Sequence, residues 1–287
     1  MTDTTSPQDA DRYAVLGNPI AHSKSPAIHA RFAELTGQRL RYERQLVGLD
    51  EFPAMLERLI ASGMRGCNVT VPFKFEAFAA ANLRSARAEL AQAANTLSFQ
   101  NGQVHADNTD GTGLVRDIQD NAGLDLAGRD VLLIGAGGAA AGVLAPLLLA
   151  QPKRLVLVNR TLDKALALVA RHRAHPALAA ALSGCELSAA ALDQVPGQFD
   201  VVINATASSL GGAAVPVVAS VLRPGALVYD MMYGPAATAL LDWAAAHGAT
   251  GRDGLGMLVE QAAEAFSVWR GVRPPAAQVL SEMRTLA

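Results

Sequence analysis

The sequence contains few of the residues that mark disulfide-stapled or metal-binding proteins. Its two cysteines, Cys67 and Cys185, belong neither to a CxxC pair nor to any metal-ligand spacing. Two histidines, His172 and His175, lie in an arginine-bearing helical stretch without other ligands nearby. We therefore expect no disulfide framework and no metal, and a reducing compartment, the cytoplasm, as the location.

Charge is also scarce, because charged residues make up only 17% of the chain and the formal net charge is −2. Such a weak overall field predicts no nucleic-acid partner and no binding to a membrane surface. A small anionic substrate would have to be held by local groups. The sequence does not distinguish a monomer from a homodimer.

Long uninterrupted apolar runs are missing as well. The most apolar stretch, residues 131–150, has the length of a membrane span, about 20 residues, but glycines and a proline interrupt it. A strand, a turn and a helix explain it better. Residues 1–11 are polar and acidic, without a positive or an apolar region, so we expect a disordered leader and no secretion signal.

Apolar periodicity and turn residues predict alternating strands and helices along the chain. Strands are predicted at residues 13–16, 41–47, 66–71, 131–134, 155–158, 200–203 and 227–229. Helices are predicted at residues 26–36, 51–61, 112–121, 138–150 and 163–173, with further helices opening at Pro72 and after Gly254. The alanine-rich residues 177–192 are interpreted as helix and turn. This alternation favours an α/β fold with mainly parallel sheets.

The length predicts about two domains. We expect an N-terminal α/β domain with a mainly parallel sheet, a Rossmann domain, and a cleft between them. The C-terminal helices are expected to pack back on the first domain, which makes it discontinuous. The predicted boundaries are 1–112 with 255–287 for the first domain, and 113–254 for the second.

The clearest motif follows the strand at residues 131–134 directly and opens a helix. Its first glycine permits a tight turn, its second lets the backbone approach a pyrophosphate, and Ala140 replaces the third. The helix N-terminus offers free N–H groups to phosphate. The motif predicts a dinucleotide site at Gly135, Ala136, Gly137, Gly138 and Ala139. The alternative is a glycine-rich turn in an unrelated α/β protein.

The end of the following strand indicates which nucleotide is bound. NAD enzymes usually place an acid there for the ribose 2′-OH, whereas this chain has Asn159, Arg160 and Thr161, with Lys164 close behind. Arg160 can stack on adenine or hold a 2′-phosphate, so NADP is favoured over NAD. Alternatively, Thr161 only caps the next helix and Arg160 is solvated.

Residues 67–71 alternate as a strand, which puts Asn68 and Thr70 together on one face. Pro72 suits the first turn of a helix, and Lys74 then lies within that turn. The helix dipole opposes a cation there and favours the uncharged amine, which suits proton transfer. The alternative is a lysine that reaches solvent.

Other polar residues have structural alternatives when each is taken alone. Ser25 and Pro26 are typical of an N-cap and first helical residue, although the hydroxyls of Ser23 and Ser25 would also suit a carboxylate. His22 beside Ser23 suggests a hydrolase only weakly, because no GxSxG elbow accompanies it. Asn95, Asp110 and Gln261 could be a turn residue, a helix cap and a surface residue.

Together these segments resemble the shikimate dehydrogenase family over nearly the whole chain from Tyr13. Each motif alone is modest, but their order and spacing are specific. The matching segments are residues 17–26, 68–74, 94–96, 107–111, 135–139, 159–161, 204–206, 229–231 and 253–258. The resemblance implies an NADP-dependent oxidoreductase that reversibly reduces 3-dehydroshikimate to shikimate. The first domain would then bind substrate and the second NADP(H).

The resemblance also implies roles for individual residues. Lys74 and Asp110 would form the catalytic pair, with Lys74 the proton donor. Ser23, Ser25 and Tyr233 would hold the substrate carboxylate, and the ring hydroxyls would be oriented by Asn68, Thr70, Asn95, Asp110 and Gln261. Besides the glycine turn, the NADP contacts would be Asn159, Arg160, Thr161, Lys164, Met231 and Gly254.

The chain departs from the family pattern at two places. Ala140 and Ala141 stand where some relatives have Ser-Arg, and Ala207 stands where Ser is common. Both changes could weaken cofactor binding without removing a catalytic residue.

The main rival functions are a quinate/shikimate dehydrogenase that prefers NAD, and a non-catalytic regulator that binds NADP or shikimate. A methyltransferase is disfavoured by Arg160.

Overall fold

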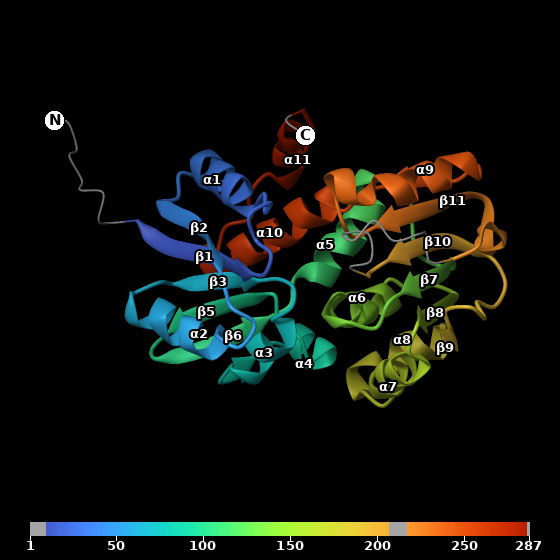
Figure 1. Cartoon of the computed structure of the whole chain (residues 1–287), viewed down its shortest axis with the longest axis horizontal. Helices are drawn as coiled ribbons and strands as arrows, with labels where there is room; N and C mark the ends of the chain where they lie inside the picture. The colour runs from blue at the N-terminus through green and yellow to red at the C-terminus, as the bar shows by residue number, and fades with distance from the viewer. Residues whose placement is uncertain (1–9, 207–216, 286–287) are drawn as a thin grey trace. The chain divides into compact units, whose positions relative to one another are not determined.

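The computed structural model describes residues 10–206 and 217–285, which form two compact units (Figure 1). Residues up to Thr109, together with those from Gln261 on, make the first unit, and Asp110–Glu260 make the second. The domain boundaries predicted from the sequence stay a prediction. Within the described ranges, no helix is long and apolar enough to cross a membrane.

The first unit is built on a sheet whose order is β2-β1-β3-β5-β6-β4. Its strands are β1 (Asp11–Gly17), β2 (Leu40–Leu46), β3 (Gly66–Val69), β4 (Leu83–Arg84), β5 (Thr96–Gln100) and β6 (Gln103–Asp107). β1 runs parallel to β2 and β3, and β4 parallel to β6, whereas β5 is antiparallel to both of its neighbours. The expectation of an α/β fold with mainly parallel sheets is confirmed, but the β5–β6 hairpin was not predicted.

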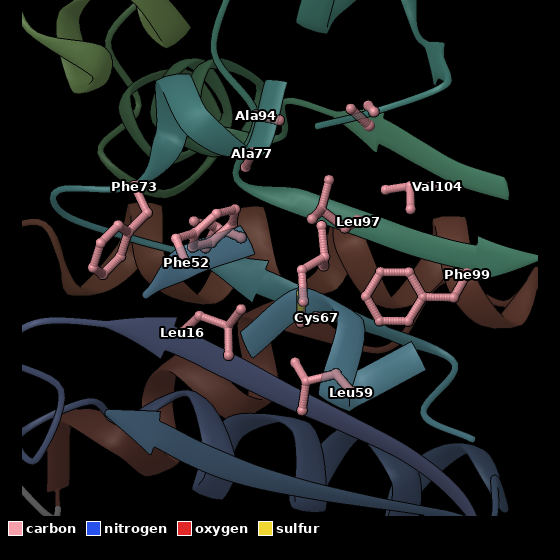
Figure 2. Close-up of a cluster of buried hydrophobic side chains, with 14 of the residues drawn as sticks. Leu16, Phe52, Leu59, Cys67, Phe73, Ala77, Ala94, Leu97, Phe99 and Val104 are labelled. Carbon is pink, nitrogen blue, oxygen red and sulfur yellow. The ribbon is translucent and has the colours of Figure 1, made fainter. Parts of the chain in front are cut away.

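Helices cover both faces of this sheet. They are α1 (Ser25–Thr36), α2 (Phe52–Ala61), α3 (Lys74–Ala79), α4 (Ala86–Ala91), the part of α10 (Leu255–Arg270) from Gln261 on, and α11 (Ala276–Thr285). Figure 2 shows one face, where Leu16, Cys67 and Leu97 of the sheet meet Phe52 and Leu59 of α2. Because side chains alternate along a strand, Asn68, the residue after Cys67, lies on the opposite face of the sheet.

The opposite face carries a cluster of aromatic side chains around His29 of α1. The His29 ring stacks on Tyr42 with centroids 4.2 Å apart and an interplanar angle of 7°. Trp269 of α10 lies 5.5 Å from His29 and stacks on Tyr13 at 4.5 Å. Burial lowers the pKa of His29 to about 3, so the ring is neutral at physiological pH.

His29 should make the stability of the protein depend on acid pH. Its pKa in the folded chain lies below the 6.5 of a free histidine, so the unfolded chain takes up the extra proton as pH falls. The stabilisation is present above pH 6.5 and decreases toward pH 3, by about 2 kcal/mol at pH 5. We expect His29→Phe, which keeps a stacked ring, to show a flatter stability profile in urea unfolding between pH 7 and pH 5. Equal slopes in both proteins would contradict this assignment.

The second unit contains a parallel sheet of order β12-β11-β10-β7-β8-β9. Its strands are β7 (Asp130–Ile134), β8 (Arg154–Asn159), β9 (Glu186–Ala191), β10 (Phe199–Asn204), β11 (Leu222–Asp230) and β12 (Thr250–Arg252). This is the doubly wound Rossmann order, in which the order of the strands reverses between the first strand, β7, and the fourth, β10. Ligands bind such sheets beyond the carboxyl ends of the strands at that point, here β7 and β10.

Helical segments connect these strands. They are α5 (Asp110–Arg116), η2 (Asp117–Asn121), α6 (Gly138–Leu149), α7 (Leu162–Arg173), η3 (Pro176–Leu178), α8 (Ala179–Gly184), η5 (Ala219–Val221), η6 (Gly234–Ala237), α9 (Thr238–Ala246) and the first turns of α10. α5 packs closely on α6, since a Cβ added to Gly111 would lie 2.3 Å from Cγ of Pro146. The helix predicted at residues 112–121 begins two residues earlier, at Asp110, and its C-terminal part, η2, has π-helical geometry.

The structure corrects several local predictions. Residues 177–192 include strand β9, because backbone pairing with β8 outweighs the helix propensity of alanine there. The predicted strand 66–71 ends at Val69, so Val71 is exposed and does not share the buried face of Cys67. Pro72 lies in the following turn rather than inside a helix. Within the predicted leader, Asp11 already belongs to β1, whereas residues 1–9 lie outside the described residues.

Candidate active site

A buried network of polar side chains forms in the first unit where β3, β5 and α10 meet. Asn68, Asn95 and Gln261, all predicted from the sequence, belong to it, as do Thr96 and Thr109, which were not. All five side chains are less than 10% exposed. The alternative of Gln261 as a surface residue is therefore wrong.

Asn95 is the centre of this network. Its Nδ2 donates to Oγ1 of Thr109 at 2.9 Å and to Oε1 of Gln261 at 3.1 Å, across 166 residues of sequence. Its Oδ1 accepts from the backbone N–H of Thr109 at 2.9 Å and from the Thr96 hydroxyl at 2.9 Å. With these contacts Asn95 holds the chain in place just before Asp110.

Asn68 is held in a fixed orientation by three partners. Its Nδ2 donates to the backbone O of Asn95 at 3.1 Å and to Oγ1 of Thr96 at 3.0 Å. Its Oδ1 accepts from the Tyr42 hydroxyl at 2.7 Å. Burial raises the pKa of Tyr42 well above its usual value, so this hydroxyl stays a donor. Both amide hydrogens of Asn68 are used, and the remaining lone pair on Oδ1 can accept a hydrogen bond from a ligand hydroxyl.

Ser23 and Ser25 lie together at the start of α1. Their hydroxyl oxygens are 3.2 Å apart, and the backbone N–H of Ser25 donates to Oγ of Ser23 at 3.3 Å. The helix is capped at Lys24 without a side-chain cap, so the predicted capping role of Ser25 is wrong. Two hydroxyls beside a helix N-terminus suit an anionic oxygen group.

Lys74 and Thr70 flank the turn between β3 and α3. Lys74 lies in the first turn of α3, as predicted, although the helix begins at Lys74 itself and not at Pro72. Its backbone O accepts from the N–H of Ala94, next to Asn95, at 2.9 Å. Thr70 continues the sheet pairing through its N–H, which donates to the backbone O of Leu16 at 2.9 Å. Asp110, nearly buried, begins α5 of the second unit. Its pairing with Lys74 stays a prediction.

In the second unit, the glycine turn joins β7 to α6 as the motif predicts. Gly135 has φ +111°, and a Cβ there would lie 3.1 Å from Cγ2 of Thr206, beyond β10. Ala136 follows it, and Gly137 caps α6, with Gly138 and Ala139 in the first turn. A Cβ on Gly137 would meet nothing within 4 Å. The turn therefore leaves open space above a helix N-terminus, as a pyrophosphate requires.

The end of β8 contains no acid. Asn159 is its last residue, and its Nδ2 donates to the backbone O of Thr161 at 2.8 Å. Thr161 is the N-cap of α7, but its hydroxyl makes no capping hydrogen bond. Arg160 and Lys164 are exposed. Two cations and an amide thus lie where a ribose 2′-substituent is expected, and this donor set fits the 2′-phosphate of NADP.

Met231 and Gly254 approach each other closely beyond β11. The Met231 N–H donates to the backbone O of Asn204 at 3.0 Å, and the Gly254 N–H donates to the backbone O of Met232 at 2.8 Å. A Cβ on Gly254 would lie 2.3 Å from the Met231 oxygen, so this position requires glycine. Tyr233 lies two residues after Met231 and is the N-cap residue of η6.

The two cysteines, the candidate metal ligands and the alanines that depart from the family pattern can also be located. Both cysteines are buried and free. Among the described residues no group of His, Cys, Asp and Glu side chains has the arrangement of a metal site. Ala140 and Ala141 are buried in α6, whereas Ala207 lies outside the described residues.

Sequence reasoning did not identify Tyr42, Thr96 or Thr109 as part of the site. Thr96 is the residue next to Asn95, and Thr109 precedes Asp110, so adjacency to predicted residues was an available signal. Tyr42 lies on the edge strand β2, whose half-exposed pattern offers no such signal.

Comparison with known proteins gives matches in three parts of the chain. The family model for the substrate-binding domain of shikimate dehydrogenase matches residues 15–97. The shikimate/quinate 5-dehydrogenase model matches residues 116–218, and the C-terminal domain model of shikimate 5′-dehydrogenase matches residues 254–284.

Individual relatives match over almost the whole chain. A shikimate dehydrogenase (NADP(+)) of Acidovorax sp. strain JS42 is 65% identical over 275 residues, which are 96% of each chain. One from Verminephrobacter eiseniae is 63% identical and covers 98% of this chain and 96% of its own. The structure of Thermus thermophilus shikimate 5-dehydrogenase in complex with NADP(H) and shikimate is 31% identical, with a TM-score of 0.82, covering 96% of this chain and 100% of that one.

Proposed function

This chain belongs to the shikimate dehydrogenase family, and from that premise we propose how its residues perform the reversible, NADP-dependent reduction of 3-dehydroshikimate to shikimate in the cytoplasm. The single observation that carries the assignment of residues is the buried network of Asn68, Asn95 and Gln261. It places amide groups from three distant segments in one fixed arrangement, as recognition of a ring with several hydroxyls requires.

The first unit binds the substrate. The Ser23 and Ser25 hydroxyls, with Tyr233 of the second unit, bind its carboxylate. Asn68 accepts a hydrogen bond from a ring hydroxyl through Oδ1, since both of its amide hydrogens are already used. Thr70, Asn95, Asp110 and Gln261 complete the set that orients the ring. The network pre-organises Asn68, Asn95 and Gln261, so these three side chains lose little conformational freedom on binding.

The second unit binds NADP. The turn from Gly135 to Ala139 holds the pyrophosphate, while Asn159, Arg160, Thr161 and Lys164 hold the adenosine part and its 2′-phosphate. Met231 and Gly254 border the nicotinamide. When bound, NADPH supplies the hydride to the C3 carbonyl carbon of 3-dehydroshikimate. Lys74 donates a proton to the resulting alkoxide, and Asp110, its partner, keeps the ammonium group oriented.

The proposal is tested by following reduced cofactor at pH 7–9 with shikimate or quinate and either NADP⁺ or NAD⁺. We expect turnover of shikimate with NADP⁺. A preference for NAD⁺ or quinate would instead support a quinate/shikimate dehydrogenase. Binding of shikimate or NADP⁺ without turnover of any pair would support a regulator.

Arg160→Ala should weaken NADP⁺ specifically. A charge-assisted hydrogen bond contributes about 1.5–3 kcal/mol, so we expect KM for NADP⁺ to rise roughly 10- to 100-fold. KM for NAD⁺, which lacks the 2′-phosphate, should change little. Lys153→Ala, which removes an exposed cation from the same unit, is the control for a change in net charge. Equal effects of Arg160→Ala on both cofactors would show that Arg160 acts on adenine alone or on the fold.

A further inference from the structure

We propose that Arg44 is a positioning and charge-supplying residue for the substrate carboxylate, a deduction that rests on the proposed function. Its Nε and Nη2 both donate to the backbone O of Ser23, at 2.9 and 2.6 Å. Ser23 is in turn bonded to Ser25 through their hydroxyls. A guanidinium group is thus fixed on the backbone of the residue that receives the carboxylate.

The location of Arg44 on β2 explains this contact. β2 is the edge strand of its sheet and pairs with β1, where Arg44 lies opposite Val15. Side chains two residues apart share a face of a strand, so Arg44 shares a face with Tyr42, which donates to Asn68. One face of β2 therefore supports both the carboxylate site and the ring site.

The charge of Arg44 is available to a ligand. Within the described residues the Arg44 guanidinium forms no ion pair, whereas the neighbouring Glu43 on the other face pairs with Arg12. The protein as a whole carries a net charge of −2, so it has no general attraction for an anion. Because Arg44 is exposed, its attraction for the carboxylate must be partly screened by solvent and sensitive to salt.

The test compares wild type with Arg44→Gln at two ionic strengths. At about 0.01 M the Debye length is about 30 Å and at about 1 M it is about 3 Å. We expect KM for shikimate to be about 2- to 5-fold higher in Arg44→Gln at the lower ionic strength, and to approach the wild-type value at the higher one. kcat and KM for NADP⁺ should stay unchanged. Arg44→Lys keeps the charge but loses the pair of hydrogen bonds from Nε and Nη2 to the Ser23 oxygen. This variant should recover part of the affinity for shikimate that Arg44→Gln loses.

Arg41→Gln is the matched control, because it removes the same charge from the other face of β2. An equal effect of both variants would assign the change to the overall field and overturn the proposal. If the ratio of the variant's KM for shikimate to the wild-type KM does not change with salt, Arg44 does not supply charge to the carboxylate, and that part of the proposal is wrong. If KM is the same in both proteins at both ionic strengths, Arg44 has no role in substrate binding. Absence of shikimate turnover or binding in the wild type would instead contradict the proposed function itself.

Discussion

Lys74→Ala should lower kcat for shikimate oxidation by about 10²- to 10⁴-fold, the range that a positioned acid or base contributes. In the proposed reaction Lys74 takes the proton from the C3 hydroxyl as the hydride leaves, and returns it in the reverse direction. Its position at the start of α3 is set by the backbone, through the hydrogen bond from Ala94 to the Lys74 oxygen. The substitution leaves this hydrogen bond intact, so the fold should be preserved.

Steady-state kinetics with NADP⁺, together with calorimetric binding of shikimate, separate catalysis from binding. A loss of kcat with shikimate still bound supports proton transfer by Lys74. Lys153→Ala, which removes an exposed lysine from the second unit, is the control and should behave as wild type. A Lys74→Ala variant that keeps more than a tenth of wild-type kcat would rule out Lys74 as the essential proton donor.

The parts of the fold that local sequence dictates were predictable. The glycine turn, the preceding strand and the following helix lie within about 20 residues, and the turn from Gly135 requires a positive φ that glycine alone adopts easily. The β5–β6 hairpin was missed although Asn101-Gly102, with positive φ at both residues, is a typical hairpin turn. β9 was missed because alanine-rich segments have the composition of helices.

The site was predictable only where a motif names its members. Asn95 and Gln261 were each ambiguous alone, and only the fold brings their amides to 3.1 Å. Arg44 and Tyr42 were not identified because a polar, half-exposed edge strand looks the same whether or not its side chains contact a site. Contacts between segments more than 100 residues apart depend on tertiary packing, which periodicity does not reveal.

Asp117→Ala should reduce the free energy of unfolding of the second unit by about 3–5 kcal/mol, since it breaks a buried ion pair from one side. The Asp117 carboxylate is 0% exposed and accepts from Nε and Nη2 of Arg252 at 2.7 and 2.6 Å. It also accepts from the Tyr229 hydroxyl at 2.7 Å and from Nδ2 of Asn121 at 3.0 Å. Alanine would leave a half-buried guanidinium and a fully buried hydroxyl without their acceptor.

The same carboxylate connects η2 to the segment around Gly254, which is proposed to border the nicotinamide. A Cβ on Gly256 would lie 1.8 Å from Oδ1 of Asp117, so the first turn of α10 is seated directly on this group, two residues after Gly254. We therefore expect Asp117→Ala to raise KM for NADP⁺ as well as to lower the urea midpoint. Asp120→Ala, an exposed acid in the same π-helical segment, should stay within about 0.5 kcal/mol of wild type. If Asp117→Ala is as stable as Asp120→Ala, the buried ion pair contributes nothing net, and packing around Gly256 alone must hold this end of α10 in place.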